Sequence, residues 1–223
     1  LLVVLGGGTV RRRDMRMLRR LHRSQLPRLA ARVVRGHGLS ATCNASFVHA
    51  SELTRPVRAI RPIASHVGER FAVGEAHDVN PVMWRELVDG GVVVRGEPVA
   101  TWGLDPEPAA LADWCRQSLA GSWRAQRDAL ASRRRPMTGS TLEWCVLGPA
   151  RLDATLVTHR ILSKDQAGVV ALARFGEAAG IVDVALAHLR GESLPSEPPR
   201  AEWRDRTVAL MTAILDAAGG PVR

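Results

Sequence analysis

The sequence changes character near Gly103. Upstream of this glycine, short β-rich apolar runs alternate with helical patterns, which is typical of an α/β domain. Downstream of Asp105 only helical patterns follow, and short polar or Gly/Pro breaks separate them, as in an antiparallel helical bundle. We therefore predict an α+β chain with an α/β domain over residues 1–103 and an all-α bundle over residues 104–223.

Turn and capping residues set the expected limits of these elements. Gly6-Gly-Gly8 ends the first strand, and Asn80-Pro81 begins a helix with an asparagine cap and a proline in its first turn. Pro27 is expected to interrupt the first helix, and Gly148-Pro149 to kink a bundle helix. The strand candidates are 1–5, 41–48, 70–73 and 92–94, and the helix candidates are 11–34, 81–90, 108–132, 140–160, 163–178, 181–190 and 200–218.

The positive charge is concentrated at the start of the chain. The formal net charge is +9, yet residues 1–60 hold twelve arginines against Asp14 and Glu52, which leaves the remainder near −1. Between Arg11 and Arg35 the arginines interleave with apolar residues at helical spacing, which favours the solvated face of an amphipathic helix. Nucleic-acid binding through phosphate contacts stays open as an alternative, although no recognition motif accompanies the charge.

Other composition features exclude several classes of protein. Hydrophobic residues make up 46% of the chain, which is enough for a packed core, and no apolar run approaches the roughly 20 residues of a membrane span. We therefore expect a cytoplasmic protein without a membrane partner. The three cysteines, Cys43, Cys115 and Cys145, are odd in number and lack metal-binding spacing, so we expect buried reduced thiols and no metal site.

Lys164 is the only lysine beside thirty arginines. Ser163 can cap a helix that begins at Lys164, and Gln166 completes a capping box, so the unpaired amides of a helix start lie beside the ammonium. Such a helix start attracts anions, and an ammonium suits a single phosphate oxygen. Two interpretations stay open from the local chemistry, namely an anion site and a solvated surface lysine.

Two segments resemble the aminoglycoside (streptomycin/spectinomycin) adenylyltransferases of bacteria. They are Glu143-Trp-Cys-Val-Leu-Gly-Pro-Ala-Arg-Leu152 with Thr155-Leu-Val-Thr-His-Arg-Ile-Leu-Ser-Lys-Asp-Gln-Ala-Gly168, and Gly74-Glu-Ala-His-Asp-Val-Asn-Pro-Val-Met-Trp84. The resemblance implies a partial nucleotidyltransferase-type domain followed by a helical domain, with ATP and the antibiotic bound between them. It also implies Mg²⁺, transfer of AMP to a hydroxyl group, and a role in antibiotic resistance.

The resemblance assigns nucleotide binding to Arg151 and Lys164, which match the family's phosphate-facing arginine and lysine. A polycationic substrate requires an acidic wall in a chain of net charge +9, because like charges repel. Glu143 and Asp153, on the same predicted helix as Arg151, are our candidates for substrate binding. Pairing of these carboxylates with neighbours on the helix is the alternative.

The chain also departs from the family pattern. Family members carry Gly-Ser followed by Asp-x-Asp at the end of the strand that Leu1–Leu5 would continue, and the two carboxylates hold divalent metal. This motif is not among these residues, and Asn44 matches the position of the acidic residue that serves as the base. A neutral amide cannot accept the proton, so we assign no catalytic residue. We expect either that the beginning of the protein is missing or that it no longer performs transfer. The alternative function is non-catalytic binding of a nucleotide or a cationic small molecule.

Overall fold

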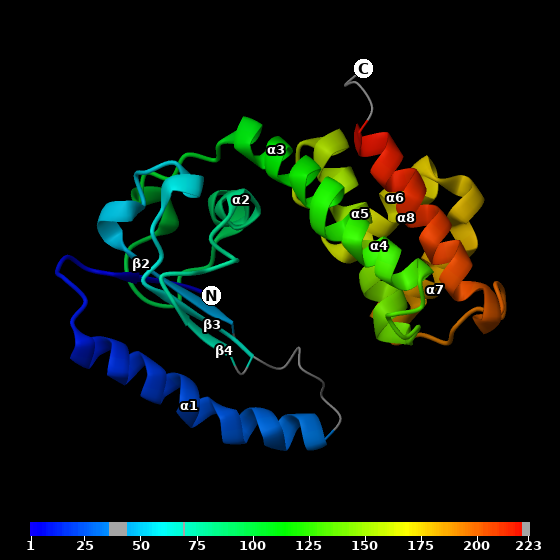
Figure 1. Ribbon diagram of the computed structural model, residues 1–223. Coiled ribbons are helices and arrows are strands. Elements are labelled where there is room, and N and C mark those ends of the chain that lie inside the picture. Colours follow the sequence, from blue (N-terminus) through cyan, green and yellow to red (C-terminus); the bar gives the residue numbers. More distant parts are fainter. Residues whose placement is uncertain (36–43, 69, 220–223) are drawn as a thin grey trace. The chain divides into compact units, whose positions relative to one another are not determined.

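The computed structural model describes residues 1–35, 44–68 and 70–219 (Figure 1). The chain divides into two compact units, Leu1–Glu107 and Pro108–Arg223, and each is described by itself. The first unit contains a sheet and helices and the second contains helices, so the predicted α+β class is confirmed. Among the described residues, no helix combines the length and the apolar character that crossing a bilayer requires.

The first unit contains a mixed sheet of four strands in the order β1-β2-β3-β4. Strand β1 pairs in parallel with β2, with Leu2 opposite Ser46, whereas β2–β3 and β3–β4 are antiparallel. A parallel pair needs a long crossover connection, which here includes helix α1. The bounds are β1 Leu2–Leu5, α1 Arg12–Val34, β2 Ala45–His49, β3 Ala64–Val67, β4 Arg70–Val73 and α2 Pro81–Gly90, with short 3₁₀ turns at Ala50–Glu52, Val57–Ala59 and Val99–Thr101.

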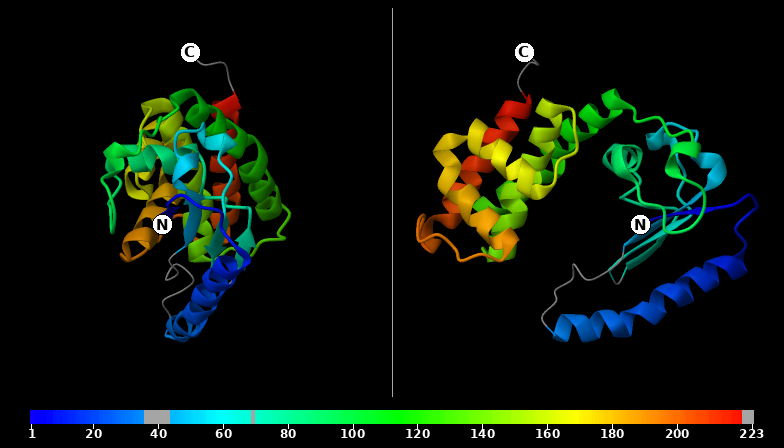
Figure 2. Two further views of the ribbon diagram at one scale, coloured as in Figure 1. Left: turned by 90° about the vertical axis from the view of Figure 1, so that its left-hand side faces the viewer. Right: turned by 180° about the vertical axis from the view of Figure 1, so that it is seen from behind.

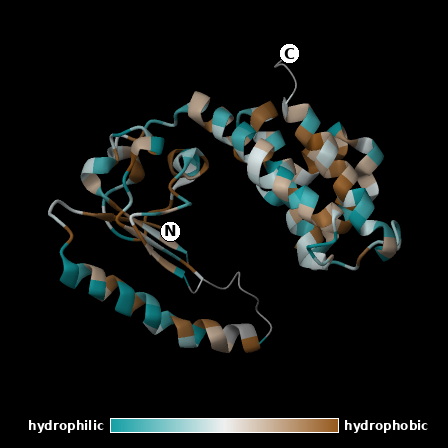
Figure 3. Ribbon diagram, viewed as in Figure 1, coloured by the Kyte–Doolittle hydropathy of each residue, from teal (hydrophilic) through white to brown (hydrophobic). Residues whose placement is uncertain are grey.

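Alternation along β1 places its side chains in two apolar clusters. Leu2 and Val4 pack against the cluster that contains Trp84 of α2, whereas Val3 and Leu5 pack against the cluster that includes Met15 of α1. Successive strand residues point to opposite faces, so α1 and α2 cover opposite faces of the sheet. Figure 2 shows α1 alongside the sheet in both views, and Figure 3 shows the hydrophobic strands beside the alternating colours of α1.

The structure confirms one sequence prediction about the helices of this unit and corrects another. Asn80 caps α2, because its Oδ1 accepts hydrogen bonds from the amides of Val82 at 3.0 Å and Met83 at 3.1 Å. The prediction that Pro27 interrupts the first helix is wrong, since α1 continues to Val34. Pro27 and Arg23 are both exposed, so water can satisfy the carbonyl that loses its intrahelical donor.

The strand predictions were right for β1 and β4 and partly right for β2, of which the predicted residues 41–43 lie outside the described residues. The predicted strand over residues 92–94 is wrong, because this segment is irregular and leaves Val92 and Val94 88% and 85% exposed. The structure instead has β3 at Ala64–Val67, which was not predicted. Its alternating small and polar residues do not form an apolar run.

The second unit is built around α5, which packs against α3, α6, α7 and α8. A π-helical turn at Leu119–Trp123 joins α3 to α4, so the predicted helix over residues 108–132 is one nearly continuous segment. The bounds are α3 Pro108–Ser118, α4 Arg124–Ala131, α5 Gly139–Thr158, α6 Lys164–Arg174, α7 Ala179–Arg190 and α8 Trp203–Gly219, with 3₁₀ turns η6 Gly176–Ala178 and η7 Arg200–Glu202.

The prediction of an antiparallel bundle is wrong for α5 and α6. Two ion pairs, Glu143–Lys164 and Asp153–Arg174, join these helices with the same sequence separation of 21 residues. Gly168 likewise lies against Leu147, with the same separation. A constant offset along both helices requires that they run in the same direction, so the segment that follows Thr158 returns along α5 before α6 begins.

Candidate functional site

The beginning of α6 has the capped geometry that its sequence predicts. Ser163 Oγ accepts a hydrogen bond from the amide of Gln166, and the Gln166 side chain accepts one from the amide of Ser163, both at 3.1 Å. This reciprocal pair is a capping box, and Lys164 is the first residue of the helix. The positive end of the helix dipole therefore lies beside the ammonium-bearing residue.

Arg151 of α5 contacts the chain segment immediately before α6, and we call this contact region the junction of α5 and α6. Its Nε donates a hydrogen bond of 2.6 Å to the carbonyl of Leu162, two residues before Lys164. The contact fixes the returning segment against α5 immediately before α6 begins. The structure thus brings the two predicted nucleotide ligands, Arg151 and Lys164, to one junction of α5 and α6.

Glu143 pairs with Lys164 in this structure. Lys164 Nζ lies 2.8 Å from Glu143 Oε1, and Nδ1 of His188 on α7 lies 3.0 Å from Glu143 Oε2. Burial opposes ionisation of Glu143, but the hydrogen bonds from Lys164 and His188 outweigh it and lower the pKa of this carboxyl. Glu143 therefore favours its charged form and holds two groups that can carry positive charge.

His188 is a member of this cluster that the sequence did not indicate. It lies 45 residues from Glu143, on a helix whose pattern predicts only an amphipathic face. His188 also packs so closely on Gly139 that a β-carbon there would lie 2.5 Å from its ring. The glycine at the start of α5 was the only sequence signal of this close approach.

Asp153, the second predicted substrate ligand, lies in the interior of the bundle. Its side chain is 4% exposed, and both oxygens accept from Arg174, at 2.8 Å from Nε and 3.2 Å from Nη2. Burial raises the pKa of Asp153, although the Arg174 guanidinium partly offsets this. The carboxylate is ten residues along α5 from Glu143, or roughly 15 Å along the axis, so the two predicted substrate ligands do not share a site.

Asn44 immediately precedes β2 in the first unit. Its side-chain Oδ1 accepts a hydrogen bond of 3.3 Å from the amide of Gly68, and its carbonyl accepts one of 2.9 Å from the amino group of Leu1. These contacts fix the start of β2 beside the start of β1 and the β3–β4 turn. They give Asn44 a structural role, and an amide does not act as a base.

A cavity of about 280 Å³ lies at the carboxyl ends of β1 and β2. Its walls come from the Gly6-Gly-Gly8 loop, the beginning of α1 and His49. Its titratable groups are Asp14 and His49, and Asp14 Oδ2 already accepts from the amide of Arg11 at 2.8 Å. Asp14 therefore caps α1, and its negative charge does not favour an anionic ligand.

The junction of α5 and α6 offers nitrogen donors, which fit phosphate oxygens better than a metal ion. Across residues 1–35, 44–68 and 70–219, no three His, Cys, Asp or Glu side chains are grouped so that they could hold a metal. No model of a known protein family and no curated protein matches this chain.

Proposed function

We propose that this chain is an aminoglycoside adenylyltransferase-like protein that binds the phosphates of ATP at the junction of α5 and α6. One observation supports the proposal most directly: Arg151 of α5 donates to the carbonyl of Leu162, two residues before Lys164, which is the first residue of the capped helix α6. A guanidinium, an ammonium and the unpaired amides of a helix start are the groups that proteins use to bind phosphate.

Lys164 has to exchange partners when a phosphate binds. Its side chain is 36% exposed, so the ammonium can turn toward a ligand without leaving the surface. Glu143 keeps a partner after this exchange, because His188 still lies on its second oxygen. In the protein without a ligand, the Glu143 carboxylate positions the Lys164 ammonium. After a phosphate has taken its place, Glu143 does not become an isolated buried charge.

The proposal covers binding, and transfer of AMP to an aminoglycoside hydroxyl needs further groups. Transfer requires carboxylates that hold the metal and a base that accepts the hydroxyl proton. Asn44 stands where the resemblance expects that base, and Glu143 and Asp153 already have cationic partners. Nucleotide binding without transfer is therefore the activity that these residues support best.

Titration calorimetry with ATP, with and without Mg²⁺, tests the proposal. Substitution of Lys164→Met or Arg151→Met should weaken binding about tenfold each, which corresponds to roughly 1.4 kcal/mol for a charged hydrogen bond at a partly exposed site. Arg116→Met is the matched control, because Arg116 forms an exposed ion pair with Asp113 on α3. Equal affinity of the wild type and the Lys164→Met/Arg151→Met double variant would exclude this site.

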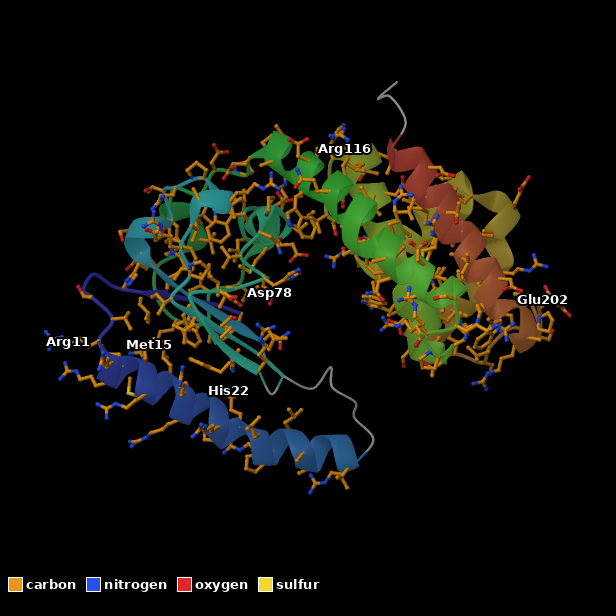
Figure 4. All side chains as sticks on the ribbon, viewed as in Figure 1. Arg11, Met15, His22, Asp78, Arg116 and Glu202 are labelled. Atoms are coloured by element: carbon orange, nitrogen blue, oxygen red, sulfur yellow. The ribbon has the colours of Figure 1, made fainter. Side chains whose placement is uncertain are left out.

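A second candidate function is suggested by the exposed arginines of the first unit. The side chains of α1 and its flanks that are exposed to solvent include Arg11, Arg12, Arg13, Arg16, Arg19, Arg20, Arg23, Arg28 and Arg35. Figure 4 labels Arg11 next to the first turn of α1. An exposed row of cations binds nucleic acid through phosphate contacts, and such binding weakens steeply with salt. Retention on duplex DNA that is insensitive to salt would contradict this alternative.

A further inference from the structure

The second unit contains a cavity of about 740 Å³ between η6 and the first half of α8. Small-molecule sites commonly measure roughly 300–1,000 Å³, so this cavity can hold a compact organic ligand. All of its lining residues belong to the helical unit, and Arg151, Lys164 and Glu143 are not among them. It is therefore separate from the proposed nucleotide site.

The floor of the cavity is apolar. Phe175 and Ala178 line it from the η6 side, and Ala209, Leu210 and Ala213 line it from α8. Leu210 is buried in the bundle core, whereas Ala209 and Ala213 are exposed and leave room because their side chains are short. This surface favours a ligand with an apolar body.

The positive and negative charges of the side chains that line the cavity do not balance each other. Arg174 is neutralised from behind by buried Asp153, at 2.8 Å, and Arg206 Nη2 pairs with Glu202 Oε2 at 2.9 Å. Glu177 and Asp205 remain, and within the described part of the chain neither side-chain carboxylate forms an ion pair or a hydrogen bond. Figure 4 shows Glu202 projecting from the bundle surface at the beginning of α8. The cavity is thus locally acidic in a chain of net charge +9.

We propose that this cavity binds a small amphipathic amine, with an apolar body on the Phe175–Ala213 floor and ammonium groups toward Glu177 and Asp205. An anion is disfavoured because both available cations are already paired and both available carboxylates would repel it. A metal ion is disfavoured because the floor supplies no oxygen ligands and, across the residues described, no group of three metal-binding side chains occurs.

The test uses the full chain and p-xylylenediamine, which carries two ammonium groups on an apolar ring. Amide chemical shifts are followed by NMR during titration with this diamine, with benzylamine, with neutral 1,4-benzenedimethanol and with anionic 1,4-phenylenediacetate. We expect affinity to fall in that order, with shifts centred on η6 and α8. High salt should lower the affinity for the diamine until it approaches the affinity for the neutral diol, because ion pairs at an exposed site are screened.

Charge and shape variants separate the two parts of the proposal. Asp205→Asn and Glu177→Gln should each weaken diamine binding about threefold, as expected for exposed ion pairs, and the double variant should bind the diamine no better than the diol. Ala213→Trp should fill the floor and abolish binding of all four probes. Asp113→Asn removes a comparable exposed carboxylate on α3 and should change nothing.

Several outcomes would overturn the proposal. They are equal affinity for the diol and the diamine, binding that the double variant retains, and chemical shifts centred away from η6 and α8. The two carboxamide substitutions keep the size of exposed side chains, and thermal unfolding of each variant verifies that α8 remains folded. Saturation with diamine should leave ATP affinity unchanged, so failure of either proposed site leaves the other testable.

Discussion

Lys164 Nζ lies 2.8 Å from Glu143 Oε1, so the predicted phosphate ligand and a predicted ligand for a cationic substrate are partners of each other. Each side chain therefore limits what the other can bind. A phosphate competes with Glu143 for the ammonium, and a cationic ligand competes with Lys164 for the carboxylate. If the proposed phosphate site is correct, its affinity for anions should therefore depend on Glu143.

Substitution of Glu143→Gln should raise the affinity for ATP by about threefold, because the ammonium loses a partly exposed partner worth roughly 0.7 kcal/mol. Asp165→Asn is the control for a general change in charge, since Asp165 is adjacent in sequence but pairs with Arg190 at 2.6 Å. Titration calorimetry of both variants provides the measurement. An equal gain in the two variants would show that Glu143 does not compete directly for Lys164.

Substitution of Arg174→Met should lower the free energy of unfolding by about 3 kcal/mol at neutral pH, because it leaves a buried carboxylate without its partner. The folded-state pKa of Asp153 is raised, so the folded protein binds this proton more tightly than the unfolded chain does. The loss should therefore shrink as the pH falls and Asp153 becomes neutral. Urea unfolding at pH 7 and pH 4.5 measures both effects.

Arg206→Met provides the matched control for this prediction. Arg206 pairs with Glu202, and both side chains are about half exposed, so its loss should change stability by less than about 1 kcal/mol. This small loss should also vary little with pH. A pH-independent effect of Arg174→Met would contradict the role assigned to buried Asp153.

The buried pair of His22 on α1 and His66 on β3 should make the first unit sensitive to acid. Their Nδ1 atoms lie 3.3 Å apart, and burial, followed by the charge of His22, lowers the pKa of His66. The unfolded chain therefore takes up this proton first as the pH falls below about 6.5. Stability should be complete above this pH and should fall below it, by at most about 1.4 kcal/mol per pH unit for one proton.

Hydrogen exchange of the α1 and β3 amides between pH 7.5 and pH 5.5 measures this loss. His66→Phe keeps an aromatic ring beside Phe47 and Phe71 and should flatten the pH dependence. His77→Gln is the control, because the His77 side chain is 87% exposed. Unchanged pH dependence in His66→Phe would show that another group is responsible.

Cys115 and Cys145 should be unreactive toward thiol reagents in the folded protein. Both residues are fully buried, and burial raises the pKa of each thiol to about 11, so the reactive thiolate is scarce at neutral pH. A Cys43→Ser variant reports on these two residues alone. It should react with Ellman's reagent only as fast as the helical unit opens, and immediate reaction under native conditions would contradict the packing described.

Local signals in the sequence predicted features that neighbouring residues determine. The cap at Asn80 and the capping box at Ser163 were correct because each depends on residues within one turn. The surroundings of Gly148, in contrast, depend on a residue that is distant in the sequence. The sequence suggests a kink beside Pro149, whereas the structure places the Trp123 indole where a side chain at Gly148 would lie. The kink itself stays a prediction.

The candidate site was only partly predictable for the same reason. Its lysine and arginine were indicated by a resemblance, and the structure brings both to one junction. Their partners depend on the direction of α6 along α5, which no local pattern encodes. An antiparallel arrangement would not place Glu143 beside Lys164 or Asp153 beside Arg174. His188 comes from a helix further along the chain and has no motif.

The shared direction of α5 and α6 restricts how this protein can vary in length. From Glu143 to Thr158 the α5 axis rises about 22 Å, and the six steps from Thr158 to Lys164 can cover at most roughly 21 Å. The connection is therefore almost fully extended. The long side chains of the paired residues must span the distance that is left between the two helices. A deletion of even one residue in 159–163 would pull Lys164 and Arg174 out of register together, so insertions should be accommodated here more readily than deletions.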